Sequence, residues 1–419
     1  SDSETVIIGH QYWEQIEKVM PKLTKVKRII ISTAEAPPGY RLPANTISLD
    51  NIYSYNEALP EVTLAADDMA RIMYTSGTTG IPKGVVQFQP VMLPPAHYKP
   101  EDIAYTCLPL FHQNAMVLTV QSALAAGAGM ALGRRFSASK FWDETRRFGA
   151  TWTSFIGAMI TILYKQPPKE SDGNNPVQFA FSGGAPRDIW QAFEKRFGLR
   201  LLEGYAAVDG AGVLENSEGI PGSIGKPFGL CEAKVVDNDG NQVGPNTIGE
   251  LLTRIKGAAG YMVIYYKNEE ETRKKNAGGW VWSGDLVYYD EDGNFFFVDR
   301  KKDALRRRGE NVSSWEVERI INQHPDVLES AVFGVPSELG EDDIMAIIVP
   351  QPGKKPDPLS IIKWCDERMA YFMIPRYIEF WDSLEKTGTH RVQKVDLKKR
   401  GVTQETWDVE KSGFKISRQ

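Results

Sequence analysis

One stretch of the chain combines glycines, hydroxyl groups and an ammonium group at close spacing. Residues 74–84 read YTSGTTGIPKG and overlap a short apolar run, residues 69–75, that is typical of a buried strand. Glycines expose backbone N–H groups, and the hydroxyls and the Lys83 ammonium add further donors, which suits a phosphate-binding loop. The spacing from Gly77 to Gly80 and Lys83 differs from that of the nucleotide P-loop. A solvated polar loop is the alternative, but this ordered combination favours phosphate binding.

Three further polar residues could take part in chemistry, although each has a structural explanation when taken alone. His112 ends the segment LPLFH, Asp285 lies in the segment WSGDL, and Arg300 lies in the charged segment DRKKD. A lone histidine is more often a hydrogen-bonded structural residue, an aspartate can start a turn, and an arginine can be a solvated charge. Their functional interpretation depends on their lying in register with the phosphate loop.

The composition excludes some classes of protein. Hydrophobic residues make up 42% of the 419 residues and charged residues 25%, as in globular proteins with an ample core. The net charge of −5 gives no reason to expect a nucleic-acid partner, because such proteins present a basic face. Cys107, Cys231 and Cys365 show no metal or redox spacing, and their odd number argues against a disulfide framework. We therefore expect a cytoplasmic protein.

One uncharged stretch is as long as a membrane-spanning helix. Residues 115–133 are long enough for a spanning helix, but Gln121, Ser122 and the glycines of residues 127–129 interrupt them. We expect a buried helix, a turn and a short buried strand there, and no transmembrane segment. Residues 1–10 carry acidic side chains and lack the order of a signal peptide.

The elements that must position the polar residues change in type along the chain. A chain of this length predicts a large α/β unit and a smaller one. In its first part, apolar runs such as residues 26–32 alternate with helical patterns. The clearest helical pattern is residues 186–197, where Pro186 suits a first helical position and Gly198 a C-terminal stop. This alternation favours a mainly parallel sheet. From about Ser223, the dipeptides Asp239-Gly240 and Asp292-Gly293 predict hairpins over residues 234–243 and 286–299.

The pattern changes again after the DRKKD segment. Ser313 and Glu316 form a plausible capping box for a helix, and strands over residues 330–335 and 344–349 and a helix over residues 359–369 follow. The predicted fold class is therefore α/β, with a large N-terminal domain of mainly parallel sheets that carries a β-rich subdomain, and a small α+β C-terminal domain. We place the large domain at residues 1–299 and the small domain, joined by a hinge, at residues 300–419.

Six segments together resemble one known family. In chain order they are YTSGTTGIPKG, LPLFH, SGGAP, GEL, WSGDL, and DRKKD continued by GENV. They resemble the acyl-adenylate-forming superfamily of acyl-CoA synthetases, firefly luciferase and peptide-synthetase adenylation domains. Residues 306–318 are most similar to the branch with carnitine- and crotonobetaine-CoA ligases. Ser1 resembles the middle of the family's large domain, so we expect the N-terminal portion of that domain to be missing.

The resemblance implies a two-step reaction. A carboxylate attacks the α-phosphate of ATP to give an acyl-adenylate and pyrophosphate; the small domain then rotates, and CoA displaces AMP. The implied function is an ATP-dependent carboxylate–CoA ligase, with ATP and Mg²⁺ as cofactors, CoA as co-substrate and a small carboxylic acid as partner. A homodimer is an option that the resemblance leaves open. Two alternatives remain: a carrier-protein acceptor in place of CoA, and a degenerate homologue that binds nucleotide or acyl-adenylate without turnover.

The resemblance also implies roles for individual residues. It assigns catalytic roles to Arg391, His112 and Lys83, a magnesium contact to Asp209 and the domain pivot to Lys302. It places His112, Phe155, Gly157 and Ala158 at the acyl pocket. The residues that it assigns to the binding of ATP and CoA are Thr75, Ser76, Gly77, Thr78, Thr79, Gly80, Gly184, Ala185, Pro186, Tyr205, Val208, Asp209, Asp285, Phe297, Arg300 and Gly309.

The sequence departs from the family's pattern at two of these sites. The family motif Tyr-Gly-x-Thr-Glu corresponds to residues 205–209, which read YAAVD, so Val208 lacks a phosphate-binding hydroxyl and Asp209 is one methylene shorter than glutamate. A direct magnesium contact can then become water-mediated. Arg391 stands at the position of the family's C-terminal lysine, and its planar guanidinium differs in shape from an ammonium. Lys386 and Lys394 are nearby alternatives.

Overall fold

The computed structural model describes residues 2–55, 58, 61–75, 82–89, 98–307, 310–337, 341–386 and 392–417. Contacts divide the chain into two units, Ser1–Ala65 and Ala66–Gln419. Within these described ranges, no helix is long and apolar enough to cross a membrane.

The first unit is a small parallel sheet with short helices. Its strands lie in the order β1-β2-β3, and Ile29, Ile30 and Ile31 of β2 are buried. The strand predicted over residues 26–32 is thus confirmed as β2. The elements are β1 (Thr5–Gly9), α1 (Trp13–Val19), β2 (Arg28–Ser32), β3 (Ile47–Ser48) and α2 (Leu49–Ile52).

The second unit begins with a hairpin that the sequence predicted differently. Strand β4 (Met69–Thr75) pairs in antiparallel register with β5 (Lys83–Phe88), and Met69 and Tyr74 are half exposed. The strand predicted over residues 69–75 is therefore confirmed as β4, but its predicted burial is wrong. In a two-stranded ribbon only one face packs against the protein, and of the β4 side chains only Met73 is buried.

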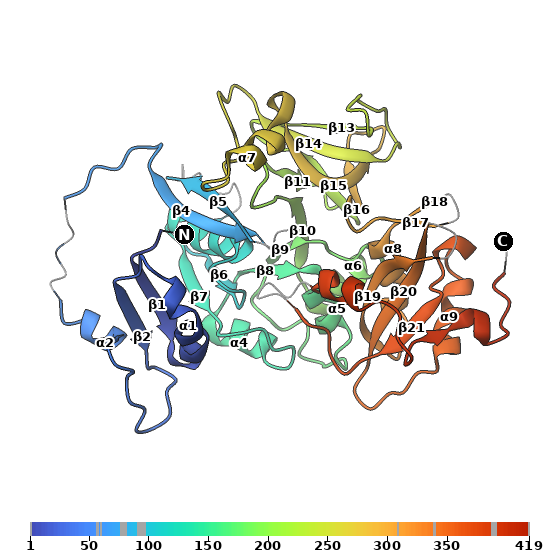
Figure 1. The fold of residues 1–419 in the computed structure, drawn as a ribbon, viewed down its shortest axis with the longest axis horizontal. Coiled ribbons are helices and arrows are strands. Elements are labelled where there is room, and N and C mark those ends of the chain that lie inside the picture. The colour runs from blue at the N-terminus through green and yellow to red at the C-terminus, as the bar shows by residue number, and fades with distance from the viewer. Residues whose placement is uncertain are drawn as a thin grey trace. The chain divides into compact units, whose positions relative to one another are not determined.

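A parallel sheet follows, and it confirms the prediction made from alternating strands and helices (Figure 1). Its strands lie in the order β10-β9-β8-β6-β7, each parallel to its neighbour. Its core is an aromatic cluster that includes Phe141, Phe155 and Phe193. The elements are β6 (Ile103–Thr106), the π-helix η3 (Asn114–Gln121), α3 (Ser122–Ala126), β7 (Gly129–Leu132), α4 (Phe141–Phe148), β8 (Trp152–Ile156), α5 (Gly157–Tyr164), β9 (Phe179–Gly183), α6 (Trp190–Phe197) and β10 (Arg200–Tyr205).

Two local predictions in this region are confirmed, except for the burial of one strand. The helix predicted over residues 186–197 is present as a 3-10 turn followed by α6, and Gly198 ends it in a left-handed conformation. The helix, turn and strand predicted over residues 115–133 are also present. However, β7 is not buried as predicted, because it lies at the sheet edge with only Ala131 covered.

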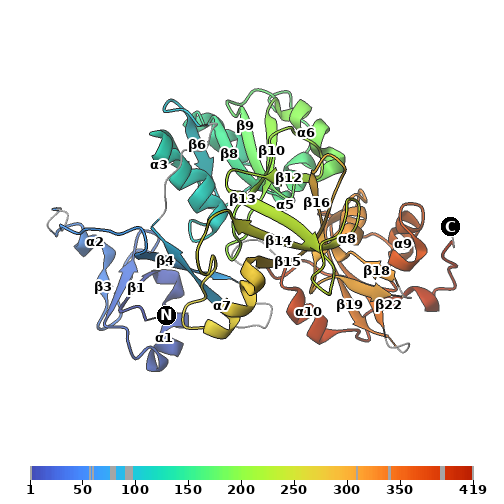
Figure 2. The same cartoon turned by 90° about the horizontal axis from the view of Figure 1, so that it is seen from above.

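The β-rich part continues the same sheet beyond β10. Its antiparallel order is β10-β11-β12-β16-β15-β14-β13, so the two parts share one set of hydrogen-bonded strands (Figure 2). The hairpin predicted around Asp292-Gly293 joins β15 and β16, and the turn at Asp239-Gly240 follows β13; both predictions are confirmed. The elements are β11 (Leu214–Asn216), β12 (Ser223–Pro227), β13 (Cys231–Val236), β14 (Gly249–Ile255), α7 (Glu269–Lys275), β15 (Val281–Tyr289) and β16 (Phe295–Arg300).

The C-terminal part is a separate α+β module with its own sheet, in the order β19-β20-β21-β22. Ser313 accepts a hydrogen bond from the Glu316 N–H at 3.1 Å, which confirms the predicted helix start. The boundary at residue 299 stays a prediction. The elements are β17 (Leu305–Arg307), β18 (Glu310–Val312), α8 (Ser314–Asn322), β19 (Val327–Pro336), β20 (Asp342–Pro350), α9 (Pro358–Asp366), β21 (Tyr377–Phe380), α10 (Lys394–Arg400) and β22 (Trp407–Asp408).

Candidate active site

The β4–β5 hairpin is held beside a segment that lies far away in sequence. The backbone N–H of Val86 donates to the carbonyl of Ile264 at 2.8 Å, and the N–H of Tyr266 donates to the carbonyl of Gly84 at 2.7 Å. These bonds place Lys83 against Tyr265, with its ammonium 5.1 Å from the ring centroid. The base of the predicted phosphate loop is therefore anchored to the segment that leads into α7.

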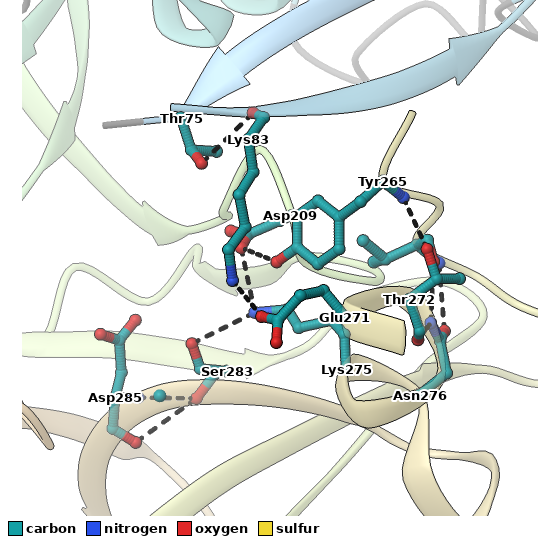
Figure 3. A network of polar contacts seen from close by, with 12 residues as sticks. Thr75, Lys83, Asp209, Tyr265, Glu271, Thr272, Lys275, Asn276, Ser283 and Asp285 are labelled. Carbon is teal, nitrogen blue, oxygen red and sulfur yellow. Dashed lines mark hydrogen bonds and ion pairs between the residues drawn. The ribbon is translucent and has the colours of Figure 1, made fainter. Parts of the chain in front are cut away.

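Lys83 is also paired with a carboxylate on α7. Its ammonium forms an ion pair with Glu271, and both side chains are less than one-third exposed. The Thr75 hydroxyl lies 3.5 Å from the carbonyl of Lys83, across the hairpin (Figure 3). The two described ends of the predicted loop thus lie together. Its other predicted residues, Ser76, Gly77, Thr78, Thr79 and Gly80, lie outside the described part of the chain.

Asp209 lies in the same polar network. Its Oδ2 accepts a hydrogen bond from the Tyr265 hydroxyl at 2.6 Å and lies 3.2 Å from the ammonium of Lys275. Lys275 also donates to the carbonyl of Ser283, at 3.4 Å. Burial alone would raise the pKa of Asp209, but the Lys275 charge and the Tyr265 hydrogen bond outweigh it and hold that pKa below its ordinary value. Asp209 is therefore a stable carboxylate in this site.

Helix α7 contributes Glu271 and Lys275, one turn apart on the same face. Asn268 caps its N-terminus by accepting from the Glu271 N–H at 3.2 Å. Beyond its C-terminus, the buried Asn276 side chain bonds four backbone groups: it accepts from the N–H of Met262 and Val263 and donates to two carbonyls. This fixes the rotation of α7 relative to the segment that carries Tyr265.

A second cluster joins the parallel and antiparallel parts of the sheet. The Tyr205 hydroxyl donates to Asp285 at 2.6 Å, and Arg300 lies 3.9 Å from the other Asp285 oxygen. Asp285 and Arg300 are paired across β15 and β16, so the sheet register sets their approach. Burial, followed by the Asp285 charge, raises the pKa of Tyr205 well above its ordinary value. Tyr205 thus remains a neutral hydrogen-bond donor to a carboxylate that is only 14% exposed.

The segment predicted to pack on adenine is held by a buried carboxyl group. Glu203 on β10 accepts hydrogen bonds from the N–H of Gly184 at 2.6 Å and of Ala185 at 2.8 Å. Burial raises the pKa of Glu203 to about 8, despite these bonds. Gly184 has a φ of +88°, which favours glycine, and Pro186 precedes the 3-10 turn before α6.

Gly157, predicted at the acyl pocket, lies directly against the predicted adenine segment. Its Cα is so close to Gly184 that any side chain would collide with the Gly184 carbonyl. The neighbouring Ala158 is exposed. The His112 ring accepts from the N–H of Asn114 at 3.3 Å, and the Asn114 side chain donates to the carbonyl of Phe155 at 3.3 Å. The structure therefore brings these predicted acyl-pocket residues into one region.

The Phe155 side chain itself points elsewhere. It has no exposed surface and packs against Phe141 and Phe193 in the aromatic core. It is therefore a core residue in this structure, and the predicted contact with an acyl group does not follow from its placement. Strand side chains alternate between faces, and the sequence did not show which face β8 turns to the core.

Two other predicted nucleotide contacts also have packing roles. Val208 packs in an apolar cluster with Val85, Val263 and other residues, including Tyr265. Phe297 packs on the apolar cluster of the antiparallel strands, and its ring stands edge-on to that of Trp315 at 6.1 Å. Val208 therefore lies beside the polar network without adding a donor to it.

The residues predicted for domain movement and CoA transfer are described in part. Lys302 is exposed in the turn after β16, where its carbonyl accepts from Lys398 at 3.3 Å. Gly309 and Arg391 lie outside the described residues. The alternative cations near Arg391 are both in ion pairs, Lys394 with Glu318 at 2.7 Å and Lys386 with Glu329 at 2.6 Å.

Comparison with known proteins agrees with this architecture. The model of the family described as "AMP-binding enzyme" matches residues 1–266, and that of the "AMP-binding enzyme C-terminal domain" matches residues 316–391. The chain belongs to the AMP-binding enzyme family. The predicted family and fold class are confirmed, and so is the predicted enzyme class, a ligase of the acyl-CoA synthetase type that acts through an acyl-adenylate.

Similar proteins include curated CoA ligases. The crotonobetaine/carnitine–CoA ligase of Escherichia coli O8 (strain IAI1) is 33% identical over 356 residues, which cover 80% of this chain and 67% of the relative. The crotonobetaine/carnitine–CoA ligase of Salmonella arizonae is 32% identical over 386 residues, which cover 86% of this chain and 73% of the relative. This family member therefore spans about two thirds of the length of those enzymes.

Solved structures show the same fold. The anthranilate CoA ligase AuaEII in complex with anthranoyl-AMP matches with a TM-score of 0.81 and 24% identity, over 95% of this chain and 78% of the other. ATP-bound MatB from Rhodopseudomonas palustris matches with a TM-score of 0.77 and 25% identity, over 95% and 79%. Sequence reasoning did not predict Lys275, Tyr265, Glu271 or Glu203 as site residues of this family member. The run of basic residues 273–275 at the end of α7 is a sequence signal that could have pointed to Lys275.

Proposed function

We propose that this chain activates a small carboxylic acid with magnesium-ATP at the site between Lys83 and Asp285, and then transfers the acyl group to CoA. One observation carries the proposal. Two clusters of opposite chemistry lie next to each other: the carboxylate of Asp285 with its Tyr205 donor, and the cations Lys83 and Lys275. A nucleotide needs this pair, because its ribose donates hydroxyls and its phosphates carry negative charge.

The two clusters are connected through β15. Lys275 donates to the Ser283 carbonyl, and Ser283 precedes Asp285 by two residues (Figure 3). In the proposed binding mode, Asp285 accepts the ribose hydroxyls and the segment of Gly184 to Pro186 packs on adenine. The phosphates then lie toward Lys83. The carboxylate substrate approaches from the region of His112 and Gly157, where a preformed geometry lowers the entropic cost of attack on the α-phosphate.

Magnesium enters this proposal through ATP. No group of three or more histidine, cysteine or acidic side chains among the described residues is arranged to hold a metal ion. Asp209 offers one carboxylate, which fits magnesium because this ion is commonly held by one or two carboxylates together with substrate phosphates and water. Bound there, magnesium would neutralise phosphate charge. Asp209 would orient it, and Lys83 would bind the phosphates directly.

The acid that is activated forms part of the proposal. The similar proteins act on crotonobetaine, carnitine and anthranilate according to their names, and in this chain the small, exposed Ala158 lies at the start of α5, next to the adenine segment. We propose a small acid with an apolar or aromatic body. Amino acids fit less well, because residues 153–159 contain no acidic side chain to pair with an ammonium group.

The test is pyrophosphate release from magnesium-ATP over a panel of acids that includes crotonobetaine, carnitine, benzoate, anthranilate and short fatty acids. Release that depends on one acid, with CoA consumed in step, supports the proposal. Release without CoA consumption, together with acyl transfer to an added carrier protein, identifies the carrier-dependent alternative. Folded protein that binds AMP but releases no pyrophosphate with any acid contradicts the proposal and supports a non-catalytic homologue.

Two broader predictions accompany this function. A homodimer is tested by light scattering of the purified protein at micromolar concentration, where a mass of about 47 kDa indicates a monomer. A cytoplasmic location is proposed because Cys107, Cys231 and Cys365 are buried free thiols.

A further inference from the structure

Helix α7 ends in three basic residues, and only one of them is turned into the polar network. Lys274 is 63% exposed and pairs with Glu270 and Glu271 on the helix surface. The Lys275 side chain is 11% exposed and reaches Asp209 and the Ser283 carbonyl. Burying an ammonium group costs free energy unless it is paired, so Lys275 can be buried here because it pairs with Asp209.

Lys275 lies between the residues proposed for phosphate and for ribose. On one side, Glu271 of the same helix pairs with Lys83; on the other, the Ser283 carbonyl leads to Asp285 (Figure 3). An ammonium carries three donors on a flexible stem, so Lys275 can keep these partners and still donate to a phosphate oxygen. In the proposed binding mode, its positive charge therefore lies where the negative phosphates of a bound nucleotide would be.

We propose that Lys275 is a phosphate-binding residue of this enzyme and that it shares Asp209 with magnesium. The inference rests on the proposed function. Asp209 already balances its charge with Lys275 at 3.2 Å, and its Oδ2 also accepts from Tyr265. A metal ion at Asp209 would therefore meet a carboxylate that is partly neutralised by the neighbouring Lys275 ammonium. Lys275 thus supplies positive charge that would otherwise come from the metal.

The neighbouring Val208 gives an independent reason for such a cation. It packs among apolar side chains and provides no donor, where the family resemblance implies a hydroxyl that contacts phosphate. Asp209 follows Val208 in the chain, and Lys275 reaches Asp209 from α7. The hydrogen-bond donor missing from residues 205–209 is thereby provided by another element.

The experiment measures the affinity of the whole chain for ATP and for adenosine by calorimetry, each in EDTA and in magnesium. We expect Lys275→Met to weaken ATP binding in EDTA by about tenfold or more, the effect of one charged hydrogen bond. Adenosine, which has no phosphate, should bind as it does to the wild type. Lys275→Arg should restore most of the ATP affinity, and the exposed Lys274→Met is the matched control without effect.

Removing Lys275 leaves the carboxylate of Asp209 without its ion pair, so a second variant keeps the test decisive. Asp209→Asn/Lys275→Met contains neither charge, and we expect it to fold and to show the same loss of ATP affinity in EDTA. Asp209→Asn alone should not weaken metal-free ATP binding, because it removes a negative charge beside the phosphates, and it should lose much of the gain that magnesium gives. These two results separate the role of the lysine from that of its partner.

Three outcomes overturn the inference. Wild-type ATP affinity in Lys275→Met excludes a phosphate contact and leaves the proposed function standing. An equal loss of ATP and adenosine binding in both Lys275→Met and the double variant shows a merely structural role. A wild-type chain that binds neither ATP nor adenosine contradicts the proposed function, and the inference falls with it.

Discussion

At the scale of single residues, Asp285 carries the proposed ribose contact. It accepts from Tyr205 at 2.6 Å and is held opposite Arg300 by the register of β15 and β16. A carboxylate that is fixed in this way can accept two ribose hydroxyls without losing freedom on binding. The residue is therefore placed for recognition before any nucleotide arrives.

We expect Asp285→Ala to weaken ATP binding at least tenfold, because hydrogen bonds to a charged group contribute about 1.5–3 kcal/mol each. Tyr205→Phe keeps the carboxylate and should have a smaller effect. Calorimetric titration with ATP measures both. Unchanged ATP affinity in Asp285→Ala would remove Asp285 from the ribose site.

Glu203 makes the stability of the protein depend on pH. Its folded-state pKa of about 8 lies above the ordinary value of 4.5, so the folded state holds its proton more tightly than the unfolded state. This contribution to stability is complete below pH 4.5 and is lost as the pH rises through 8. We expect Glu203→Gln to flatten the fall in thermal stability between these values, as measured by calorimetric melting. The same slope in both proteins would count against this assignment.

At the scale of elements, β8 and α5 lie in close contact with the segment after β9, where the acyl site is proposed. Gly157 starts α5 with its Cα against the Gly184 carbonyl, and β8 and β9 are paired in parallel up to this point. Both predicted substrate segments thus emerge from the carboxyl ends of adjacent parallel strands, where ligands of open α/β sheets commonly bind.

Gly157→Ala should force these segments apart. We expect a loss of about 1–3 kcal/mol of folding free energy, typical of overpacking, together with weaker AMP binding. Urea unfolding and AMP titration measure the two effects. Gly183→Ala is the matched control, because a methyl group there meets no neighbour within 4 Å. Equal behaviour of the two variants would show that close approach at Gly157 has no role.

At the scale of the whole molecule, polar contacts join the C-terminal module to the parallel sheet. Asp188, before α6, accepts from Arg319 at 3.0 Å and from Gln323 at 2.7 Å, both on or next to α8. The Lys165 ammonium donates to the carbonyls of Asn322 and Val327, both at 2.6 Å. These contacts hold α8 in one position relative to α5 and α6.

We expect Asp188→Ala to loosen this position by a small free energy, about 0–1 kcal/mol, because Arg319 and Asp188 are partly exposed. Hydrogen exchange of α8 should then become faster, while that of the β19–β20 core stays unchanged. Asp326→Ala removes an acidic residue that pairs within the module, with Lys354, and is the control. Protection of α8 that stays the same would show that Asp188 does not restrain it.

The sequence alone determined the family, the parallel sheet and the hairpin between β15 and β16, and it named Asp285, Arg300 and the phosphate loop as candidates. These depend on short-range information: glycines and hydroxyls in a fixed order, turn dipeptides, and alternation of strands with helices. Lys83 and Asp209 were also named, but not their partners. The sequence could not predict a partly exposed β4, because exposure depends on which strands pair with it.

Only the tertiary structure decided which cations reach the site. In sequence, Arg273, Lys274 and Lys275 are equivalent basic residues at the end of a helix. The rotation of α7, fixed by Asn268 and Asn276, turns one of them into the network with Asp209 and leaves Lys274 in solvent. The burial of Glu203 behind Gly184 depends likewise on β9 and β10 being adjacent. Long-range packing sets both, because neither contact is encoded by residues that are near in the chain.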